Sequence, residues 1–290
     1  LYALDEQVRR FESEGKVTRF EFWDLIDLVK DDSGNCIGIV AQDLRNMETR
    51  SFAGDAVLLA TGGYGLIYGK STCSQIVTGS ATAIAYKAGA VFANPEFVQV
   101  HPTCIPGEDK LRLMSESARG EGGRVWVPRK QGDTRKGKDI PEDERLYFLE
   151  EKYPIFKNLV PRDVASREIF FKYLEGYGVG GQPQVYLDLS HLDSGYIKKK
   201  LGAILEIYEK FAGEDPTKVP MLIFPGVHYT MGGICVDYEA TKSKRLNWDS
   251  PKNQMTHIPG LYALGEADHQ YHGANRLGAN SLLSCLFSGR

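Results

Sequence analysis

The sequence predicts an α/β protein with two domains. Short apolar runs and amphipathic helical patterns follow one another along the chain, as strands and helices do in such folds. Residues 56–60 form an apolar run that ends in Thr61-Gly62-Gly63, the pattern of a buried strand feeding a tight loop. With 290 residues and 42% apolar composition, the chain can bury a sizeable core and is long enough for two domains.

The N-terminal part begins with a predicted helix that stops at Gly15. Its apolar residues recur at helical spacing: Leu1, Leu4, Val8 and Phe11. Residues 20–29 and 36–44 predict two strands, joined by a polar turn at residues 31–35. Residues 78–90 are rich in Ala and Gly and predict a closely packed helix.

The character of the chain changes after Asn94-Pro95. Residues 128–146 are dense in charged residues and Gly, which predicts an exposed, mobile excursion. Asp163 is a predicted N-cap. The helix that it would start carries Val164, Ile169, Phe170 and Leu174. A further amphipathic helix carries Leu201, Ile204, Leu205, Tyr208 and Phe211. Residues 261–264 predict a strand, and after a loop rich in Gly and Asn an apolar helix begins at about Leu277.

Charge and cysteine content narrow the possible functions. A formal charge of −3 gives no electrostatic reason to expect nucleic acid as a partner. No apolar run approaches the roughly 18 residues of a membrane-spanning helix. The 5 cysteines are odd in number, widely spaced and free of any C-x-x-C pair. We therefore expect isolated thiols in a reducing compartment, with neither a disulfide framework nor a metal site.

Four stretches place cationic side chains beside glycine or proline turns. They are Val100-His101-Pro102-Thr103, Ser115-Glu116-Ser117-Ala118-Arg119-Gly120-Glu121-Gly122-Gly123, His228-Tyr229-Thr230-Met231-Gly232-Gly233 and His272-Gly273-Ala274-Asn275-Arg276-Leu277-Gly278. Glycine lets the backbone approach a ligand closely. Arginine can hold one carboxylate through a bidentate fork while a histidine N–H binds another. The pattern suits a small dicarboxylate.

Each of these features also has a structural interpretation. A buried histidine commonly only satisfies a hydrogen-bond network, and an arginine before a helix is usually a surface ion pair. The glycine-rich loops could be ordinary strand-to-helix turns. The residues by themselves therefore indicate an α/β protein with a candidate anion site, and leave both interpretations open.

The ordered set of motifs resembles the flavoprotein subunits of succinate dehydrogenases and fumarate reductases. Besides the four stretches, the resemblance rests on Ala60-Thr61-Gly62-Gly63, Pro161-Arg162-Asp163, Leu264-Gly265-Glu266 and Asn280-Ser281-Leu282-Leu283, and it covers essentially the whole chain. Residues 114–124 and 147–154 look most like the menaquinone-linked branch known from Gram-positive bacteria.

The resemblance implies a Rossmann-type FAD-binding domain interrupted by an α+β capping domain. The capping domain would span residues 97–226, between two pieces of the FAD-binding domain at 1–96 and 227–290. The family's G-x-G-x-x-G loop and the histidine that carries its flavin covalently would precede Leu1, and a helical domain would follow residue 290. Without these segments, we expect the chain to hold FAD poorly.

The resemblance also implies roles for individual residues. In the family's reaction, the flavin takes a hydride from one methylene carbon of succinate while a base removes a proton from the next. The proton-transferring arginine falls on Arg162, with Glu116 and Arg119 as the relay to solvent. The substrate-binding positions are His101, Ser115, His228 and Arg276. Ser115 stands where many members have threonine, and either hydroxyl can donate a hydrogen bond to a carboxylate.

An arginine that acts as an acid and a base needs surroundings that disfavour its cation. Arg162 precedes Asp163 at the predicted start of a helix, and the family pattern brings Arg119 and Arg276 near it. A helix N-terminus and neighbouring cations both disfavour positive charge.

The positions implied for FAD lie at the two ends of the chain. They are Ala60, Thr61, Gly62, Gly63, Glu266, Ser281 and Leu282. Ser281 and Leu282 would open a helix whose positive end stabilises an anionic reduced flavin. Ser80 stands where many members have aspartate, so it is not predicted to contact the cofactor.

The resemblance implies an enzyme that interconverts succinate and fumarate and passes electrons from FAD to an iron–sulfur subunit and on to quinone. Through that complex it would reach a membrane-anchor cytochrome b subunit, at the cytoplasmic face of the cell membrane. L-Aspartate oxidase, a soluble relative that shares the H-P-T, R-G-E-G, R-D and N-R-L motifs, is the alternative enzyme. A non-catalytic scaffold is a third interpretation, against which the number of retained charged site positions argues.

Overall fold

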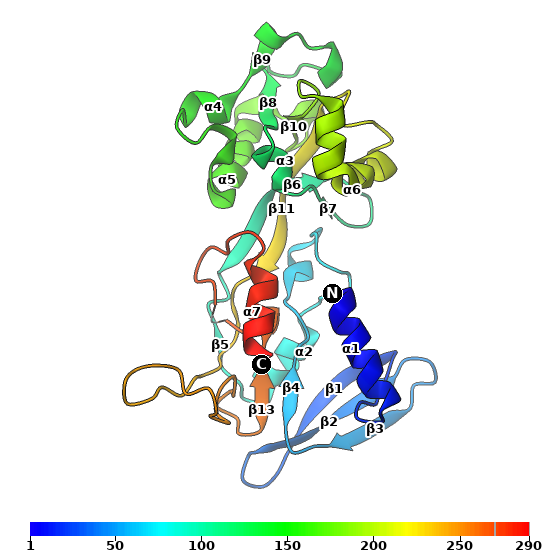
Figure 1. Cartoon of the computed structure of the whole chain (residues 1–290), viewed down its shortest axis with the longest axis vertical. Coiled ribbons are helices and arrows are strands. Elements are labelled where there is room, and N and C mark those ends of the chain that lie inside the picture. Colours follow the sequence, from blue (N-terminus) through cyan, green and yellow to red (C-terminus); the bar gives the residue numbers. More distant parts are fainter. Residues whose placement is uncertain (270, 290) are drawn as a thin grey trace.

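A computed structural model describes residues 1–269 and 271–289 of the chain. The molecule is elongated and consists of two lobes (Figure 1). We call residues 98–230 the distal lobe, and residues 1–97 with 231–289 the basal lobe. Strands β6 (Val98–Ile105) and β11 (Met221–Thr230) pair antiparallel and run from one lobe toward the other (Figure 1). The expected domain boundary at residue 226 falls inside β11, so a continuous strand crosses it.

The basal lobe begins with helix α1 (Tyr2–Ser13) and a three-stranded antiparallel sheet, β1 (Trp23–Lys30), β2 (Cys36–Asp43) and β3 (Thr49–Ala53). The helix, the first two strands and the turn between them confirm the predictions. Strand β3 has one half-buried residue among exposed ones, so it lacks the alternation that predicts a strand. No residue of helix α1 is buried, so its apolar stripe does not pack into a core.

Two sequence-distant segments build the centre of the basal lobe. The strands predicted near residues 56–60 and 261–264 are confirmed as β4 (Val57–Leu59) and β13 (Leu261–Ala263), and the structure pairs them in parallel. Strand β5 (Phe92–Ala93) pairs with β12 (Gly233–Ile234), and helices α2 (Ser80–Lys87) and α7 (Asn280–Ser288) complete the lobe. Short 3-10 turns, η1 (Gly65–Tyr68) and η7 (Gly265–Ala267), follow β4 and β13.

The distal lobe is built on a six-stranded sheet with the order β7-β6-β11-β10-β8-β9 and antiparallel neighbours. The remaining strands are β7 (Arg112–Leu113), β8 (Arg124–Pro128), β9 (Arg145–Leu146) and β10 (Val185–Asp188). Its helices are α3 (Ser117–Gly120), α4 (Phe148–Lys152), α5 (Arg162–Lys172) and α6 (Ser194–Ala212). Single turns lie at Gly137–Asp139, Glu142–Glu144, Lys157–Leu159, Tyr173–Tyr177 and Val179–Gly181.

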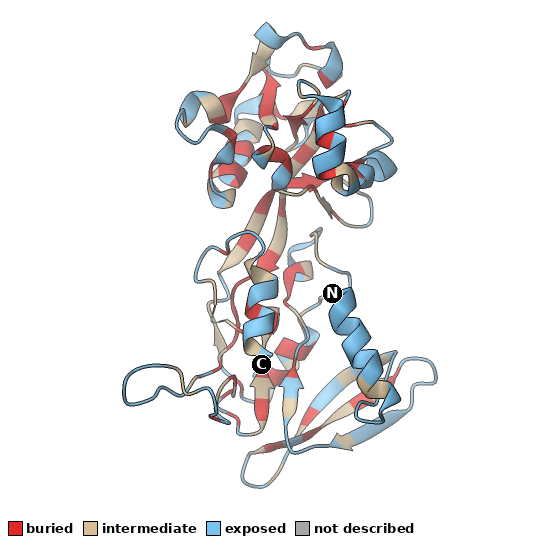
Figure 2. Cartoon of the chain, viewed as in Figure 1, coloured by how far each residue is buried: buried red, intermediate tan, exposed pale blue. Residues whose placement is uncertain are grey.

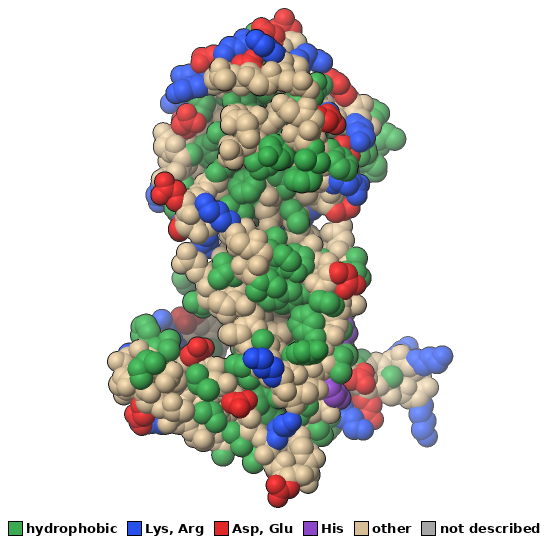
Figure 3. Space-filling model, turned by 180° about the vertical axis from the view of Figure 1, so that it is seen from behind, with side chains coloured by type: hydrophobic (Ala, Val, Ile, Leu, Met, Phe, Trp, Pro, Cys, Tyr) green, Lys and Arg blue, Asp and Glu red, His purple; other side chains and the backbone are tan. Residues whose placement is uncertain are grey.

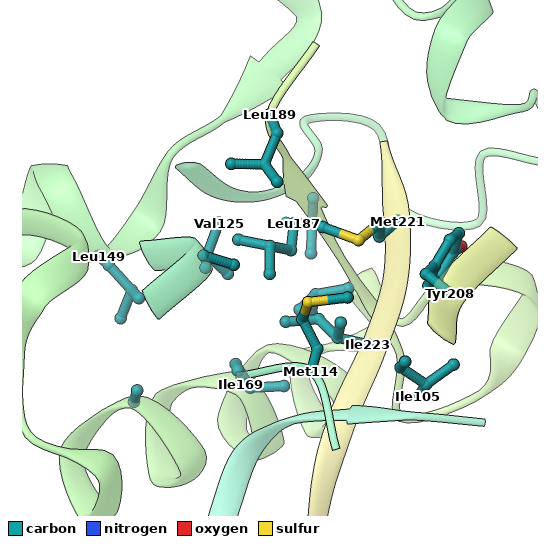
Figure 4. Packing of buried hydrophobic residues seen from close by; sticks show 14 of the residues in the cluster. Ile105, Met114, Val125, Leu149, Ile169, Leu187, Leu189, Tyr208, Met221 and Ile223 are labelled. Atoms are coloured by element: carbon teal, nitrogen blue, oxygen red, sulfur yellow. The ribbon is translucent and has the colours of Figure 1, made fainter. Parts of the chain in front are cut away.

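The main hydrophobic core lies between this sheet and its helices. Side chains from β8, β10 and β11 meet those of α5 and α6, and Figure 4 shows Leu187, Met221 and Ile223 among them. Figure 2 shows the buried residues gathered along the sheet and in the paired strands that lead to the basal lobe. Among the described residues, no helix combines the length and apolar character needed to cross a membrane.

Residues 128–146 are predicted to be exposed by their composition, but part of the stretch is buried. Ile140 is 1% exposed and packs with Trp126, Tyr147 and Tyr186. A Cβ on Gly137 would lie 2.7 Å from the Tyr186 ring, so this glycine permits a close approach of the backbone. Most charged residues of the stretch are exposed, and charged side chains crowd the tip of the distal lobe (Figure 3), but the side chains of Asp133 and Arg145 are only 4% and 15% exposed.

Two helix starts also differ from prediction. Pro161, with extended backbone, caps α5, and Asp163 lies in its first turn, where it accepts a hydrogen bond from Asn275 Nδ2 at 3.2 Å. Of the apolar residues predicted for this helix, Phe170 is 47% exposed. Helix α7 starts at Asn280 rather than near Leu277, because Ala279 has a left-handed backbone with φ 65°.

Candidate functional site at the junction of the lobes

The pairing of β6 with β11 brings two predicted substrate-binding histidines together. His101 lies opposite Gly226, and a register shift between Val227 and Tyr229 places His228 beside it. The two imidazole ring centroids are 5.1 Å apart, with an interplanar angle of 70°. This contact joins residues that are far apart in the sequence, at the point where the lobes meet.

His101 is fully buried and presents an unpaired N–H. The Thr103 backbone N–H donates to its Nδ1 at 3.3 Å, so the proton of the neutral ring lies on Nε2. Nε2 is buried and has no partner among the described residues. Burial, followed by the charge of Arg162, lowers the pKa of His101 to about 2. The ring is therefore a neutral hydrogen-bond donor at physiological pH, with its donor free for a ligand.

His228 is held from its other side by a hydroxyl. Its Nδ1 lies 2.6 Å from Thr72 Oγ1, which leaves Nε2 free of that contact. Burial, followed by the charges of Arg276 and Arg162, lowers the pKa of His228 to about 4. Both histidines are therefore uncharged at neutral pH, and neither needs a counter-ion within the protein.

Glu116 joins the two predicted proton-transfer arginines into a chain. Its Oε2 accepts from Arg162 Nε at 2.6 Å, and its Oε1 accepts from Arg119 Nη2 at 2.6 Å. Arg119 has a side chain only 1% exposed and also donates to the carbonyls of Asn158 and Val160. This hydrogen-bond chain leads from Arg162 in α5 to Arg119 on the buried side of α3, and the Glu116 side chain between them is 36% exposed.

Arg276 is buried beside the same group of residues. It is 4% exposed, its guanidinium carbon lies 4.5 Å from the centre of the Tyr229 ring, and its Nε has no partner among the described residues. Burial, followed by the charge of Arg162, lowers the pKa of Arg276 from its usual value. The charge of Arg276 also lowers the pKa of His228, so Arg276 lies within electrostatic reach of the histidine pair.

Gln99 connects these parts, and sequence reasoning missed it. Its side chain is 4% exposed; Oε1 accepts from Arg162 Nη1 at 3.1 Å, and Nε2 donates to the Arg276 carbonyl at 2.6 Å. Gln99 and His101 are two positions apart on β6, so their side chains share one face of the strand. That period of two was the available signal.

Ser115 is the predicted substrate-binding residue with the weakest connection to this cluster. It is half-buried, and its hydroxyl donates to Ser117 Oγ at 3.1 Å and accepts from the Ser117 backbone N–H at 3.2 Å. None of its hydrogen bonds among the described residues joins it to the histidines or to Arg162. Its neighbour in the sequence, Glu116, does bond to Arg162.

The positions predicted for FAD gather at the carboxyl ends of β4 and β13. Parallel strands commonly bind ligands at that edge. Glu266 follows β13, and its Oε1 accepts from the Thr230 backbone N–H at 2.9 Å. A Cβ on Gly63 would lie 2.1 Å from Thr230 Oγ1, so only glycine fits there. Desolvation raises the pKa of Glu266.

Ser281 and Leu282 lie in the first turn of α7, where no side chain caps the free backbone amides. Such an uncapped helix start can accept the polar edge of an anionic ligand. Leu282 is 57% exposed. Ala60 and Thr61 follow β4, the strand that pairs in parallel with β13. The set of glycine turns, carboxylate and open amides fits a flavin dinucleotide, and among the described residues no cluster of three or more His, Cys, Asp or Glu side chains suits a metal ion.

Fold and site together define a mixed α/β protein in which two neutral histidines and several arginines cluster where the two lobes meet. Residues 1–282 match the family described as FAD binding domain. The chain belongs to this family.

Relatives and solved structures agree with this assignment. The succinate dehydrogenase flavoprotein subunit of Bacillus subtilis is 56% identical over 290 residues, covering 100% of this chain and 45% of that protein. The mitochondrial flavoprotein subunit of Oryza sativa is 39% identical over 91% of this chain. A quinol fumarate reductase structure from E. coli superposes with a TM-score of 0.77 at 33% identity, covering 97% of this chain and 45% of that one. The chain thus spans about half the length of the proteins it matches.

Proposed function

We propose that the chain is the dicarboxylate-binding part of an FAD-dependent flavoprotein subunit that interconverts succinate and fumarate. The observation that carries the proposal is the junction cluster. Buried His101, half-buried His228 and buried Arg276 all lie within electrostatic reach of Arg162, which leads into a Glu116–Arg119 hydrogen-bond chain. The similarity to succinate dehydrogenase and fumarate reductase subunits supports it.

The binding groups suit a dianion with two separated carboxylates. The free Nε2–H of His101 donates to one carboxylate, together with His228. Arg276, with an unpaired buried Nε, holds the other through its guanidinium. Ser115 adds a hydroxyl donor at the rim. Because the histidines are neutral, they contribute direction while the arginines contribute the charge that balances the ligand.

Arg162 is the group that exchanges a proton with substrate carbon, and Glu116 and Arg119 carry that proton onward. Each step in the chain is a 2.6 Å contact, short enough for direct transfer between the paired atoms. Bound FAD supplies the hydride acceptor for succinate oxidation and the hydride donor for fumarate reduction. Ala60, Thr61, Gly62, Gly63, Glu266, Ser281 and Leu282 hold it at the β4/β13 edge.

The finer architecture is part of the same proposal. Residues 97–226 form a capping domain over an FAD-binding domain made of residues 1–96 and 227–290. Electrons leave through an iron–sulfur subunit and a cytochrome b membrane anchor to quinone. The assembled complex lies peripherally at the cytoplasmic face of the cell membrane. The similarity to subunits of such complexes supports these points.

The test is steady-state turnover of the full-length, FAD-loaded flavoprotein with an artificial electron acceptor. Succinate is the expected substrate, with fumarate as product. L-Aspartate is the competing substrate, assayed with oxygen and with fumarate as acceptors. Oxidation of L-aspartate without oxidation of succinate would replace the proposal with an L-aspartate oxidase. Turnover of neither compound would overturn both.

A further inference from the structure

Gln99 has a buried neutral side chain that hydrogen-bonds both to Arg162 and to the loop that carries Arg276. On one side its Oε1 accepts from Arg162 Nη1 at 3.1 Å. On the other side its Nε2 donates to the Arg276 carbonyl at 2.6 Å and to Asn275 Oδ1 at 3.3 Å. Arg162 belongs to α5 in the distal lobe, and the Asn275–Arg276 loop belongs to the basal lobe.

The two contacts need opposite hydrogen-bonding properties at one side-chain end. The guanidinium of Arg162 offers only donors, so its partner must accept, whereas a backbone carbonyl accepts, so its partner must donate. A primary amide meets both needs without a charge. Glutamate would lose the donor, and a methionine of similar length would lose both functions.

The setting leaves little room for the two arginines to find other partners. Gln99 is 4% exposed, and a Cβ on Gly278 would lie only 3.1 Å from Arg162 Nη2, so a larger residue there would crowd that guanidinium. Glu116 holds Arg162 at Nε, and Gln99 holds it at Nη1. Two anchors on different nitrogens fix the plane of the guanidinium, which one anchor would leave free to rotate.

We propose that Gln99 is a positioning residue. It orients the Arg162 guanidinium toward the substrate carbon, and it ties the Arg276 loop to β6 so that both arginines hold one geometry. This inference rests on the proposed function, because succinate turnover is the measurement that tests it. Gln99 itself exchanges no proton and touches no reacting atom. A misplacement of about 1 Å at such a site can cost about a hundredfold in rate.

The experiment compares Gln99→Met and Gln99→Glu in the full-length, FAD-loaded flavoprotein. Gln99→Met removes both contacts, so we expect kcat for succinate to fall about tenfold or more and KM to rise. Gln99→Glu keeps an acceptor for Arg162 but loses the donor to the Arg276 carbonyl. We therefore expect KM to rise while kcat falls less than in Gln99→Met. A merely structural residue would not split the two constants in this way.

Gln254 is the matched control. It is 6% exposed, and its Nε2 donates to the Ala263 carbonyl at 2.9 Å, away from the cluster. Gln254→Met should lower the unfolding temperature while leaving kcat and KM within about twofold for molecules that keep their flavin.

The outcomes separate the two proposals. A wild-type protein that fails to oxidise succinate overturns the proposed function, and the positioning role with it. A wild-type protein that turns over, with both Gln99 variants within about twofold in kcat and KM, overturns the positioning role alone. If Gln99→Met does not fold, Gln99→Glu decides by itself: unchanged KM for succinate and unchanged affinity for fumarate, measured from the flavin spectrum, rule the role out.

Discussion

Arg162 and Arg276 lie in one cluster but have different surroundings. Arg162 donates to Glu116 and Gln99 and starts a chain that ends at Arg119. Within the described residues, Arg276 makes no hydrogen bond to a carboxylate, and its guanidinium lies over the Tyr229 ring. The first arrangement suits a group that exchanges a proton, and the second suits one that binds a carboxylate supplied by the ligand.

We expect Arg162→Lys in the full-length enzyme to lower turnover by about 10²–10⁴-fold while bound flavin remains, since general acid–base catalysis typically contributes that much. Lysine keeps the charge but lacks the planar fork and its two simultaneous anchors. Steady-state kinetics with succinate measure the effect. Arg167→Lys, on the exposed face of the same helix, is the control and should be silent. Turnover of Arg162→Lys within a few-fold of wild type would contradict its role.

Arg276→Ala should behave differently from Arg162→Lys. It removes a group that acts in the ground state as well as in the transition state, so we expect KM to rise along with the loss in kcat. Affinity for fumarate, followed through the flavin spectrum, gives the same information without turnover. An Arg276→Ala protein with wild-type KM and affinity would exclude a carboxylate clamp there.

The neutral histidines make stability depend on pH in a defined direction. His101 and His228 have folded-state pKa values lowered from 6.5 to about 2 and about 4. Below about pH 6.5 these histidines bind protons in the unfolded chain but not in the folded chain. Their contribution to the free energy of unfolding is therefore fully present above about pH 6.5 and is lost as the pH falls toward 4. The loss approaches about 1.4 kcal/mol per pH unit for each histidine.

Urea unfolding at pH 7.5 and pH 5 measures this loss. Replacing both His101 and His228 with Asn should flatten the dependence in this range. His257→Asn, at an exposed histidine that contacts the Gly89 carbonyl, should leave it intact. An equally steep dependence in the double variant would show that other groups cause it.

At the scale of elements, helices α6 and α7 differ in how their first backbone amides are satisfied. Helix α6 has a complete N-terminal cap, because Asp193 Oδ1 accepts from the Tyr196 backbone N–H at 2.7 Å, and it ends at Gly213 with φ 72°. Helix α7 has no side-chain cap, and its first amides stay open at the edge proposed for FAD. The other long helices, α1, α2 and α5, also lack a side-chain cap, so α6 is the exception among them.

Asp193→Ala should destabilise the protein by about 1 kcal/mol, since it removes the acceptor for one of the free amides of α6. Chemical denaturation measures the change. Asp193→Ser, which keeps a capping oxygen, should recover most of the stability. Equal destabilisation by both substitutions would mean that the side chain acts through something other than the cap.

At the scale of the whole molecule, the proposed function predicts assembly with other subunits. The described part of the chain has no membrane-crossing helix, and the proposed complex would recruit it to the membrane through other subunits. The full-length flavoprotein should therefore co-purify with an iron–sulfur subunit from membranes of its source cell. Affinity purification with absorbance and iron analysis tests this. A fully active, partner-free enzyme that reduces oxygen would favour the oxidase alternative.

Much of the fold was predictable because periodic patterns are local. Apolar residues of α6 repeat at helical spacing, β1 and β2 flank a polar turn, and β4 ends in Thr61-Gly62-Gly63. The same logic failed where distant groups decide the outcome. Asp163 has the chemistry of an N-cap, but Pro161 starts α5, and Asp163 bonds to Asn275, 112 positions away.

The sequence by itself determined the mixed α/β class and the residue types able to bind a dicarboxylate, because both depend on composition and short-range spacing. The tertiary structure decided which of those residues meet. The register of β6 against β11 sets His101 beside His228, and the inter-lobe contact sets Gln99 between Arg162 and Arg276. It also buried Ile140 within a charged segment. The local pattern of a strand indicates which face it buries, but it does not say which distant segment that face will meet.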